Sequence, residues 1–158
     1  MKPNPLAGRV PHLVLLVEDN EDHAELIKRS LSQNRMANQI IWVDNGEKAL
    51  HYLLHKDEYH DPSTSQRPNL ILLDLRLPRI DGLEVLRTIK GNPELQQIPV
   101  VILTSSAAAT DIAKAYEFHA NSYIVKPLDF AKFTGLLDDL GYYWLGWNQQ
   151  PNCLNDTR

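Results

Sequence analysis

Residues 69–74 read NLILLD, a run of four apolar side chains that ends in an aspartate. An apolar run of this length, without polar alternation, is typical of a strand that is buried on both faces of a parallel sheet. The next residues, LRLPRIDG at 75–82, contain a proline and a glycine and favour a loop. The stretch therefore predicts a buried strand with Asp74 at its carboxyl end.

Three further apolar runs are followed directly by polar residues. Glu18 and Asp19 follow HLVLLV, Thr104 follows PVVIL, and Lys126 follows SYIV. In a parallel sheet all carboxyl ends lie along one edge, and ligands bind in the crevice there. We therefore expect these four residues to converge on Asp74, which ends the middle run and should lie deepest.

Strand and helix patterns alternate five times along the chain. The strands are predicted at 12–17, 39–43, 69–74, 99–104 and 122–126, and the helices at 21–33, 46–56, 82–91, 110–119 and 129–145. Such alternation implies right-handed βαβ units and a sheet with helices on both faces. The expected fold class is α/β, a doubly wound three-layer sandwich.

The composition of the 158-residue chain is that of one soluble globular domain. No apolar run approaches the ~20 residues of a membrane span, and the first ten residues lack the apolar core of a signal peptide. The single cysteine, Cys153, cannot form an internal disulfide, so we expect a cytoplasmic protein. A net charge of -4 without a dense run of Lys and Arg argues against nucleic acid as the main partner.

Residues 56–68, KDEYHDPSTSQRP, are polar and rich in turn formers, which predicts an unusually long surface loop. His51 and His55 are four residues apart on the preceding helix, and His60 is nearby. This spacing can hold zinc, but HYLLH lacks the glutamate of the metalloprotease motif, so exposed histidines are the favoured interpretation.

The last helix continues into an aromatic extension at 141–158. Apolar residues follow helical spacing at Phe133, Leu136, Leu137, Leu140, Tyr143, Trp144 and Trp147. Gly135, Gly141 and Gly146 each weaken a helix by about 1 kcal/mol, so its last turns need outside support. The aromatic side chains either pack on the sheet or form a patch for self-association, and we favour self-association. After Pro151 the sequence predicts disorder.

Glu18, Asp19 and Asp74 pose an electrostatic problem if they meet at one edge. Two ionised carboxylates ~4 Å apart repel by ~4 kcal/mol at an intermediate effective dielectric. A hard divalent ion with oxygen ligands answers this, and Mg²⁺ commonly takes one or two carboxylates plus waters. A phosphoryl group would then find donors in the ion, in Lys126 and in the Thr104 hydroxyl. A carboxylate can itself accept a phosphoryl group as an acyl phosphate.

These residues resemble a known family. VEDN at 17–20, LLDLRLPRIDG at 72–82, ILTSS at 102–106 and SYIVKP at 122–127 look like the signature blocks of response-regulator receiver domains. The resemblance covers about 12–140 and implies a flavodoxin-like sheet in the order 2-1-3-4-5. No output domain follows, and the loop and tail look most like the small stand-alone regulators paired with bacterial phytochromes.

The resemblance implies that Asp74 accepts a phosphoryl group from a phosphohistidine of a sensor histidine kinase. It also implies that Asp19 and Asp74 bind Mg²⁺ directly, Glu18 through water, and the backbone carbonyl of Arg76 completes the set. Arg76 also lies two residues past the nucleophile, beside the expected path of hydrolytic water. We hypothesise that its side chain alters the lifetime of the phosphoryl group.

By the same resemblance, Thr104 and Lys126 bind the phosphoryl oxygens, and Tyr123 is the aromatic switch that turns inward on activation. The change repacks the face made by the fourth helix, fifth strand and fifth helix, which then binds a partner or a second copy. The Lys126–Pro127 peptide bond resembles the cis bond of the family. Asp81 is interpreted as a residue of the turn into the third helix.

Other function classes are weaker. A flavin or nucleotide enzyme could share the fold, but the chain has no GxGxxG and no GxxxxGK[ST] motif. An acyl-phosphate hydrolase of the DxD type is disfavoured because the first strand ends in Glu18-Asp19-Asn20. A pure interaction module that no longer accepts phosphate stays open, although Asp74, Thr104 and Lys126 speak against it. The favoured prediction is a signalling protein and not an enzyme.

Overall fold

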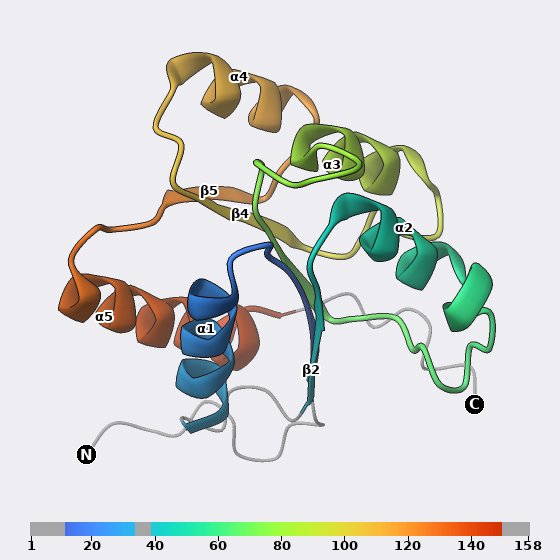
Figure 1. The fold of residues 1–158 in the computed structure, drawn as a ribbon, viewed down its shortest axis with the longest axis horizontal. Helices are drawn as coiled ribbons and strands as arrows, with labels where there is room; N and C mark the ends of the chain where they lie inside the picture. The colour runs from blue at the N-terminus through green and yellow to red at the C-terminus, as the bar shows by residue number, and fades with distance from the viewer. Residues whose placement is uncertain (1–11, 34–38, 150–158) are drawn as a thin grey trace.

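Five parallel strands form one sheet in the computed structural model, which describes residues 12–33 and 39–149 (Figure 1). The strands are β1 (Leu13–Val17), β2 (Gln39–Val43), β3 (Leu70–Leu73), β4 (Val100–Thr104) and β5 (Ser122–Val125). Their order is β2-β1-β3-β4-β5, which confirms the predicted topology. Every residue of β1, β3 and β4 is buried, because helices cover both faces of these strands.

Five α-helices cover the two faces of the sheet. They are α1 (Glu21–Gln33), α2 (Gly46–Leu54), α3 (Gly82–Gly91), α4 (Ala109–Glu117) and α5 (Phe130–Gly141). Figure 1 shows α1 and α5 on one face and α2, α3 and α4 on the other. The result is the predicted three-layer α/β sandwich. None of the helices in the described segments has the length and apolar character that a membrane crossing requires.

Each face of the sheet has its own hydrophobic core, because successive side chains of a strand point to opposite faces. In β1, Leu15 and Val17 pack with the core under α2, α3 and α4, whereas Val14 and Leu16 pack with the core under α1 and α5. Burying a side chain of this size stabilises the fold by roughly 1.5–3 kcal/mol. The two cores hold the strands rigidly, so the residues that follow them are fixed in space.

The polar segment at 56–68 is a surface loop with internal structure. It begins with a 3₁₀ turn, η1 (Asp57–Tyr59), and later buries Ser65. The Ser65 hydroxyl donates to the carbonyl oxygens of Tyr59 and Asp61 at 2.8 Å each. The Tyr52 hydroxyl of α2 donates to the carbonyl oxygen of Gln66 at 2.7 Å. These bonds fasten the loop to α2, which its composition did not predict.

The predicted helix at 129–145 changes its geometry near Gly141. α5 ends there, and a π-helix, η2 (Tyr142–Trp147), continues the chain. Because a π-helix has more residues per turn than an α-helix, the side that faces the core shifts in register. Leu145 is fully buried, whereas Tyr143 and Trp147 are about half exposed (53% and 54%). The α-helix predicted to run to residue 145 therefore ends at Gly141, and of the two alternatives for Tyr143 and Trp147 the structure shows exposure. The predictions for Cys153 and for disorder after Pro151 lie outside the described residues.

Candidate functional site

Asp74 lies at the carboxyl edge of the sheet, directly after the central strand β3. Its backbone N–H donates to the carbonyl oxygen of Val17 at 3.0 Å, which keeps it aligned with β1. Its Oδ1 atom accepts the backbone N–H groups of Leu75 at 2.7 Å and Arg76 at 3.3 Å. These two bonds fix one carboxylate oxygen in the loop, and Oδ2 is left for other partners.

Two glycines let the loop after β3 pack against the starts of neighbouring helices. A Cβ atom on Gly82 would lie 2.3 Å from the carbonyl oxygen of Asp74, and one on Gly46 would lie 2.0 Å from that of Ile80. Neither approach is possible for a real side chain, so only glycine permits this close backbone contact. A larger residue at either position would displace the loop that carries Asp74.

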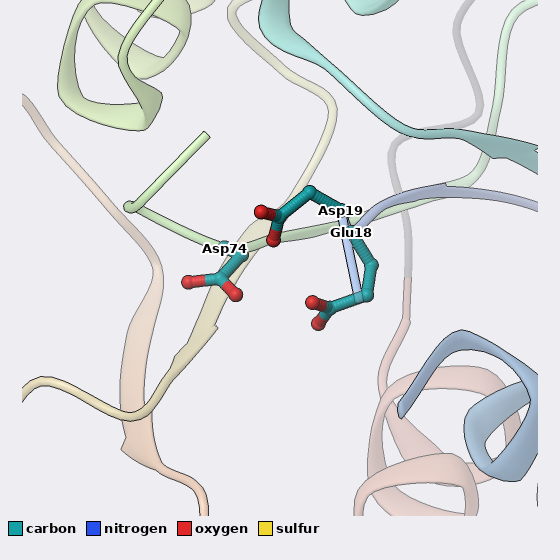
Figure 2. Close-up of side chains that lie close together, drawn as sticks. All are labelled: Glu18, Asp19 and Asp74. Carbon is teal, nitrogen blue, oxygen red and sulfur yellow. The ribbon is translucent and has the colours of Figure 1, made fainter. Parts of the chain in front are cut away.

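Three carboxylates meet at the ends of β1 and β3, as the sequence predicted (Figure 2). Oxygen atoms of Glu18, Asp19 and Asp74 all lie within 4.8 Å of one another. Glu18 and Asp74 are buried, and Asp19 is exposed. Among the described residues this is the one group of acidic, histidine or cysteine side chains spaced to hold a metal ion.

Lys126 is inserted between two of these carboxylates. Its backbone N–H donates to the carbonyl oxygen of Thr104 at 2.7 Å, which places it at the end of β5 beside β4. Its Nζ atom lies 2.6 Å from Glu18 Oε1, 3.0 Å from Asp74 Oδ2 and 3.0 Å from His23 Nδ1. We call Lys126, Glu18, Asp74 and His23 the buried cluster.

Burial perturbs the carboxyl group of Glu18 in the buried cluster. The pKa of Glu18 is raised from its ordinary value of 4.5 to about 7, chiefly because the carboxyl group is buried. The hydrogen bond and charge of Lys126 oppose this rise, and the charge of Asp74 adds to it. Lys126 therefore offsets only part of the cost of burying the Glu18 carboxylate. Carboxylate oxygens are the preferred ligands of hard divalent cations, so the donor set fits such an ion.

A second group of polar residues joins the loop after β3 to β4, β5 and α4. The Arg76 guanidinium donates to Asp111 Oδ2, and the Ser106 hydroxyl donates to the same oxygen at 2.6 Å. The Tyr123 hydroxyl donates to the carbonyl oxygen of Ser106 at 2.8 Å. We call Arg76, Asp111, Ser106 and Tyr123 the surface cluster. Thr104 is fully buried beside it and accepts the backbone N–H of Ser106 through Oγ1 at 3.4 Å.

The peptide bond between Lys126 and Pro127 is trans, so the predicted cis bond is wrong. The trans form of an X–Pro bond is intrinsically favoured by about 0.5–1 kcal/mol. The side-chain contacts of Lys126 with both carboxylates form without the cis isomer.

The three histidines near the long loop contact different atoms of that loop. His51 Nδ1 lies 3.2 Å from Asp57 Oδ2, and His60 Nδ1 lies 3.0 Å from the carbonyl oxygen of Asp57. His55 Nε2 lies 2.9 Å from the carbonyl oxygen of Ser65. Their ring nitrogens thus contact different groups within the loop. Asp81 is the residue before the first turn of α3, in agreement with its interpretation as a turn residue.

The doubly wound sheet, with clustered acids and a buried lysine at its carboxyl edge, defines the class of response-regulator receivers. The chain belongs to this family, since the family model described as "Response regulator receiver domain" matches residues 14–138. It is therefore a signalling protein of two-component systems, in which the partner is a histidine kinase.

Two relatives are similar over most of their length. The chain is 43% identical to the probable methanogenesis regulatory protein FilR2 of Methanothrix harundinacea over 146 residues, 92% of each protein. It is 38% identical to response regulator Rcp1 of Synechocystis over 135 residues, 85% of this chain and 90% of Rcp1.

Two solved structures are similar over nearly the whole chain. The Mn²⁺-bound form of Rcp1 matches with a TM-score of 0.84, covering 89% of this chain and 99% of Rcp1. The phosphorylated cyanobacterial phytochrome response regulator RcpA matches at 36% identity and a TM-score of 0.85, covering 90% of this chain and all of RcpA. The protein is thus a response regulator homologous to phytochrome-associated regulators.

Three residues of the two clusters were not anticipated from the sequence. His23 and Asp111 lie in α1 and α4, and Ser106 lies in the loop between β4 and α4. None of them follows an apolar run directly, so the strand-end pattern does not select them. Ser106 lies two residues past Thr104, and this spacing is the sequence signal that could have pointed to it as a site residue.

Proposed function

We propose that Asp74 accepts a phosphoryl group from a phosphohistidine of a sensor histidine kinase. The bond from phosphorus to the imidazole nitrogen breaks, a bond from phosphorus to Asp74 oxygen forms, and the imidazole nitrogen takes up a proton. The observation that carries the proposal is the contact of Lys126 Nζ with Asp74 Oδ2 at 3.0 Å beside two further carboxylates. This arrangement supplies positioning and charge neutralisation, which are what phosphoryl transfer needs.

We further propose Mg²⁺ as the resident ion, held by Asp19 and Asp74, by Glu18 through water, and by the backbone carbonyl of Arg76. The ion would neutralise charge on the transferring oxygens. Two buried carboxylates, Glu18 and Asp74, share the single ammonium of Lys126, which supports a further cation at this place. The related regulator Rcp1 has a Mn²⁺-bound form, which supports a divalent metal.

Lys126 and Thr104 are proposed to bind the phosphoryl oxygens, and Tyr123 to act as the switch. Tyr123 now donates to the carbonyl oxygen of Ser106, so its hydroxyl is tied to the loop between β4 and α4. Movement of Thr104 toward the phosphoryl group would shift that loop and change the Tyr123 contact. A phosphoryl group shifts this equilibrium only by its different interaction free energy with the two states.

The proposed domain organisation is a receiver at 12–140 with an aromatic extension at 141–158. The proposed location is the cytoplasm, where the histidine kinase presents its phosphohistidine. Nucleic acid is not a proposed partner, because the chain carries a net charge of -4. The proposed activity is signalling, with self-phosphorylation from small donors and slow loss of phosphate but no turnover of a separate substrate.

A phytochrome-type kinase is the proposed partner, on the basis of the similarity to the phytochrome response regulator RcpA. The similarity to FilR2 favours a kinase with another sensor as the second candidate. Phosphotransfer from purified autophosphorylated kinases of both types separates them. Faster transfer from the phytochrome kinase at short times supports the first candidate, and the reverse order supports the second.

Self-association is proposed on the face formed by α4, β5 and α5 together with the extension. Large apolar side chains are exposed along these elements: Tyr116, Val125, Tyr142, Tyr143 and Trp147. A second copy of the chain would bury them. Sedimentation of the parent and of Trp147→Ser, each with and without phosphorylation, tests this. A monomeric parent in both states would contradict it.

The first test is the intact mass of the protein after incubation with acetyl phosphate, with and without Mg²⁺, for the parent and Asp74→Asn. We expect one phosphoryl adduct that needs both Mg²⁺ and Asp74. Absence of an adduct from folded parent under every condition would favour an interaction module instead.

A further inference from the structure

His23 contacts the amine of the buried cluster although it belongs to no predicted site. It lies in the first turn of α1, where its backbone N–H donates to Asn20 Oδ1 at 3.0 Å. Its ring lies edge-on to Phe133 of α5, with ring centres 5.7 Å apart at an interplanar angle of 77°. The ring is therefore fixed from two helices, with Nδ1 directed at Lys126.

The three partners of Lys126 match the three N–H groups of an ammonium. They are Glu18 Oε1, Asp74 Oδ2 and His23 Nδ1, at 2.6, 3.0 and 3.0 Å from Nζ. An ammonium only donates hydrogen bonds, so His23 Nδ1 accepts and the ring is neutral with its proton on Nε2. Burial, followed by the positive charge of Lys126, lowers the pKa of His23, which favours this neutral form.

The three partners differ in what happens to them during phosphoryl transfer. Under the proposed function, Asp74 acquires the phosphoryl group and Glu18 becomes part of the ion site. Both of their contacts with Lys126 must therefore change. His23 binds neither the phosphoryl group nor the ion, so its contact is the one that persists through the reaction. A long lysine side chain without such a contact would have more rotamers to lose on binding the phosphoryl oxygens.

We propose that His23 is a positioning residue for the reaction at Asp74, and that its Nδ1 atom holds the Lys126 amine toward the phosphoryl oxygens. The proposal rests on the proposed function, because it assigns His23 a part in that same reaction. His23 acts through Lys126 and touches no reacting atom.

The test compares the rate of adduct formation from acetyl phosphate and Mg²⁺ for the parent, His23→Leu and His23→Gln. Leucine fills similar space without an acceptor, and the amide oxygen of glutamine can accept in place of Nδ1. We expect His23→Leu to react about fivefold more slowly, the equivalent of one hydrogen bond, and His23→Gln to recover most of the parent rate. His51→Leu is the matched control, since His51 is also a half-buried helical histidine but lies in α2 and contacts Asp57.

A pH series of the parent and His23→Gln distinguishes positioning from simple packing. The charged groups around His23 are Lys126, Asp74, Asp22 and Asp19, and they are present in both proteins. Protonated His23 cannot accept from Lys126 and repels it. The ratio of the parent rate to the His23→Gln rate should therefore fall as the pH is lowered through the pKa of His23, which lies below its ordinary value of 6.5.

The outcomes separate this inference from the proposed function. If the folded parent forms no adduct, the proposed function fails and takes the inference with it. If the parent forms the adduct, an unchanged rate in His23→Leu, or equal losses in the leucine and glutamine variants, overturns the inference alone. A rate ratio that does not change with pH also overturns it, and this result needs only the glutamine variant to fold.

Discussion

Two cationic side chains of this site, Lys126 and Arg76, are held in opposite ways. The Lys126 side chain is 3% exposed and contacts two buried carboxylates. The Arg76 side chain is 65% exposed and pairs with Asp111, whose side chain is 12% exposed. A buried charge depends on its partners, whereas an exposed one is hydrated by water. The comparison indicates that the buried cluster depends on its ion pairs for stability far more than the surface cluster does.

The largest expected effect comes from Lys126→Met, which tests the buried half of the comparison. The variant leaves Glu18 and Asp74 facing each other without a cation. We expect the free energy of unfolding to fall by about 3–5 kcal/mol at pH about 8 without metal, as for a broken buried ion pair. Urea unfolding measures it, with the exposed Lys132→Met as control. Equal free energies of unfolding for Lys126→Met and Lys132→Met would contradict the dependence of the buried carboxylates on Lys126.

The second prediction concerns pH and Glu18. Its pKa in the folded protein is about 7, against an ordinary value of 4.5, so the folded state binds more protons between these values. The stability contributed by this proton is fully present below pH about 4.5 and is lost as pH rises through about 7. The loss is at most about 3 kcal/mol.

Glu18→Gln should remove this part of the pH dependence. In metal-free urea unfolding, the stability of Glu18→Gln relative to the parent should therefore rise from pH about 5 to about 7.5. Parallel curves for the two proteins would mean that Glu18 titrates near its ordinary value, and that Lys126 balances the buried cluster completely.

Three of the four residues of the buried cluster could be predicted from the sequence for a physical reason. Glu18, Asp74 and Lys126 each follow an apolar run directly, and a parallel sheet brings all such positions to one edge. His23 and Asp111 lie on helices, and their approach depends on how α1 and α4 pack against the sheet. One helical turn carries side chains in every direction, so the sequence alone does not select these two.

The end of the chain was predicted less well, because one assumption about helical period failed. A 3.6-residue period places Tyr143 and Trp147 with Leu140 on one stripe. The π-helical segment instead buries Leu145 and exposes both aromatic side chains. Whether a helix continues as α or π depends on packing against the core, and glycines at 141 and 146 make the α-helical alternative weaker. The cis bond at Pro127 rested on resemblance alone and was wrong.

A smaller effect is expected in the surface cluster from Asp111→Ala. Asp111 accepts from both Arg76 and Ser106, so its loss leaves the Ser106 hydroxyl without this acceptor. We expect the free energy of unfolding to fall by about 1–2 kcal/mol and hydrogen exchange at the start of α4 to become faster. Glu117→Ala, an exposed acid at the other end of α4, is the control. A loss as large as that of Lys126→Met would remove the distinction between the clusters.

The smallest effect on stability is expected for Arg76→Asn, below about 1 kcal/mol, because the guanidinium is largely exposed. Its effect should appear instead in the decay of the phosphorylated protein. Arg76 spans from the loop after β3 to Asp111 of α4, which also accepts from Ser106, so a shorter side chain opens that edge to water. We expect the mass adduct on Asp74 to decay several-fold faster than in the parent.

Arg79→Asn is the matched control, since Arg79 lies in the same loop with a positive φ of 72° that asparagine tolerates. Equal decay rates in Arg76→Asn and the parent would refute a role of Arg76 in phosphate lifetime and leave it as a surface ion pair only.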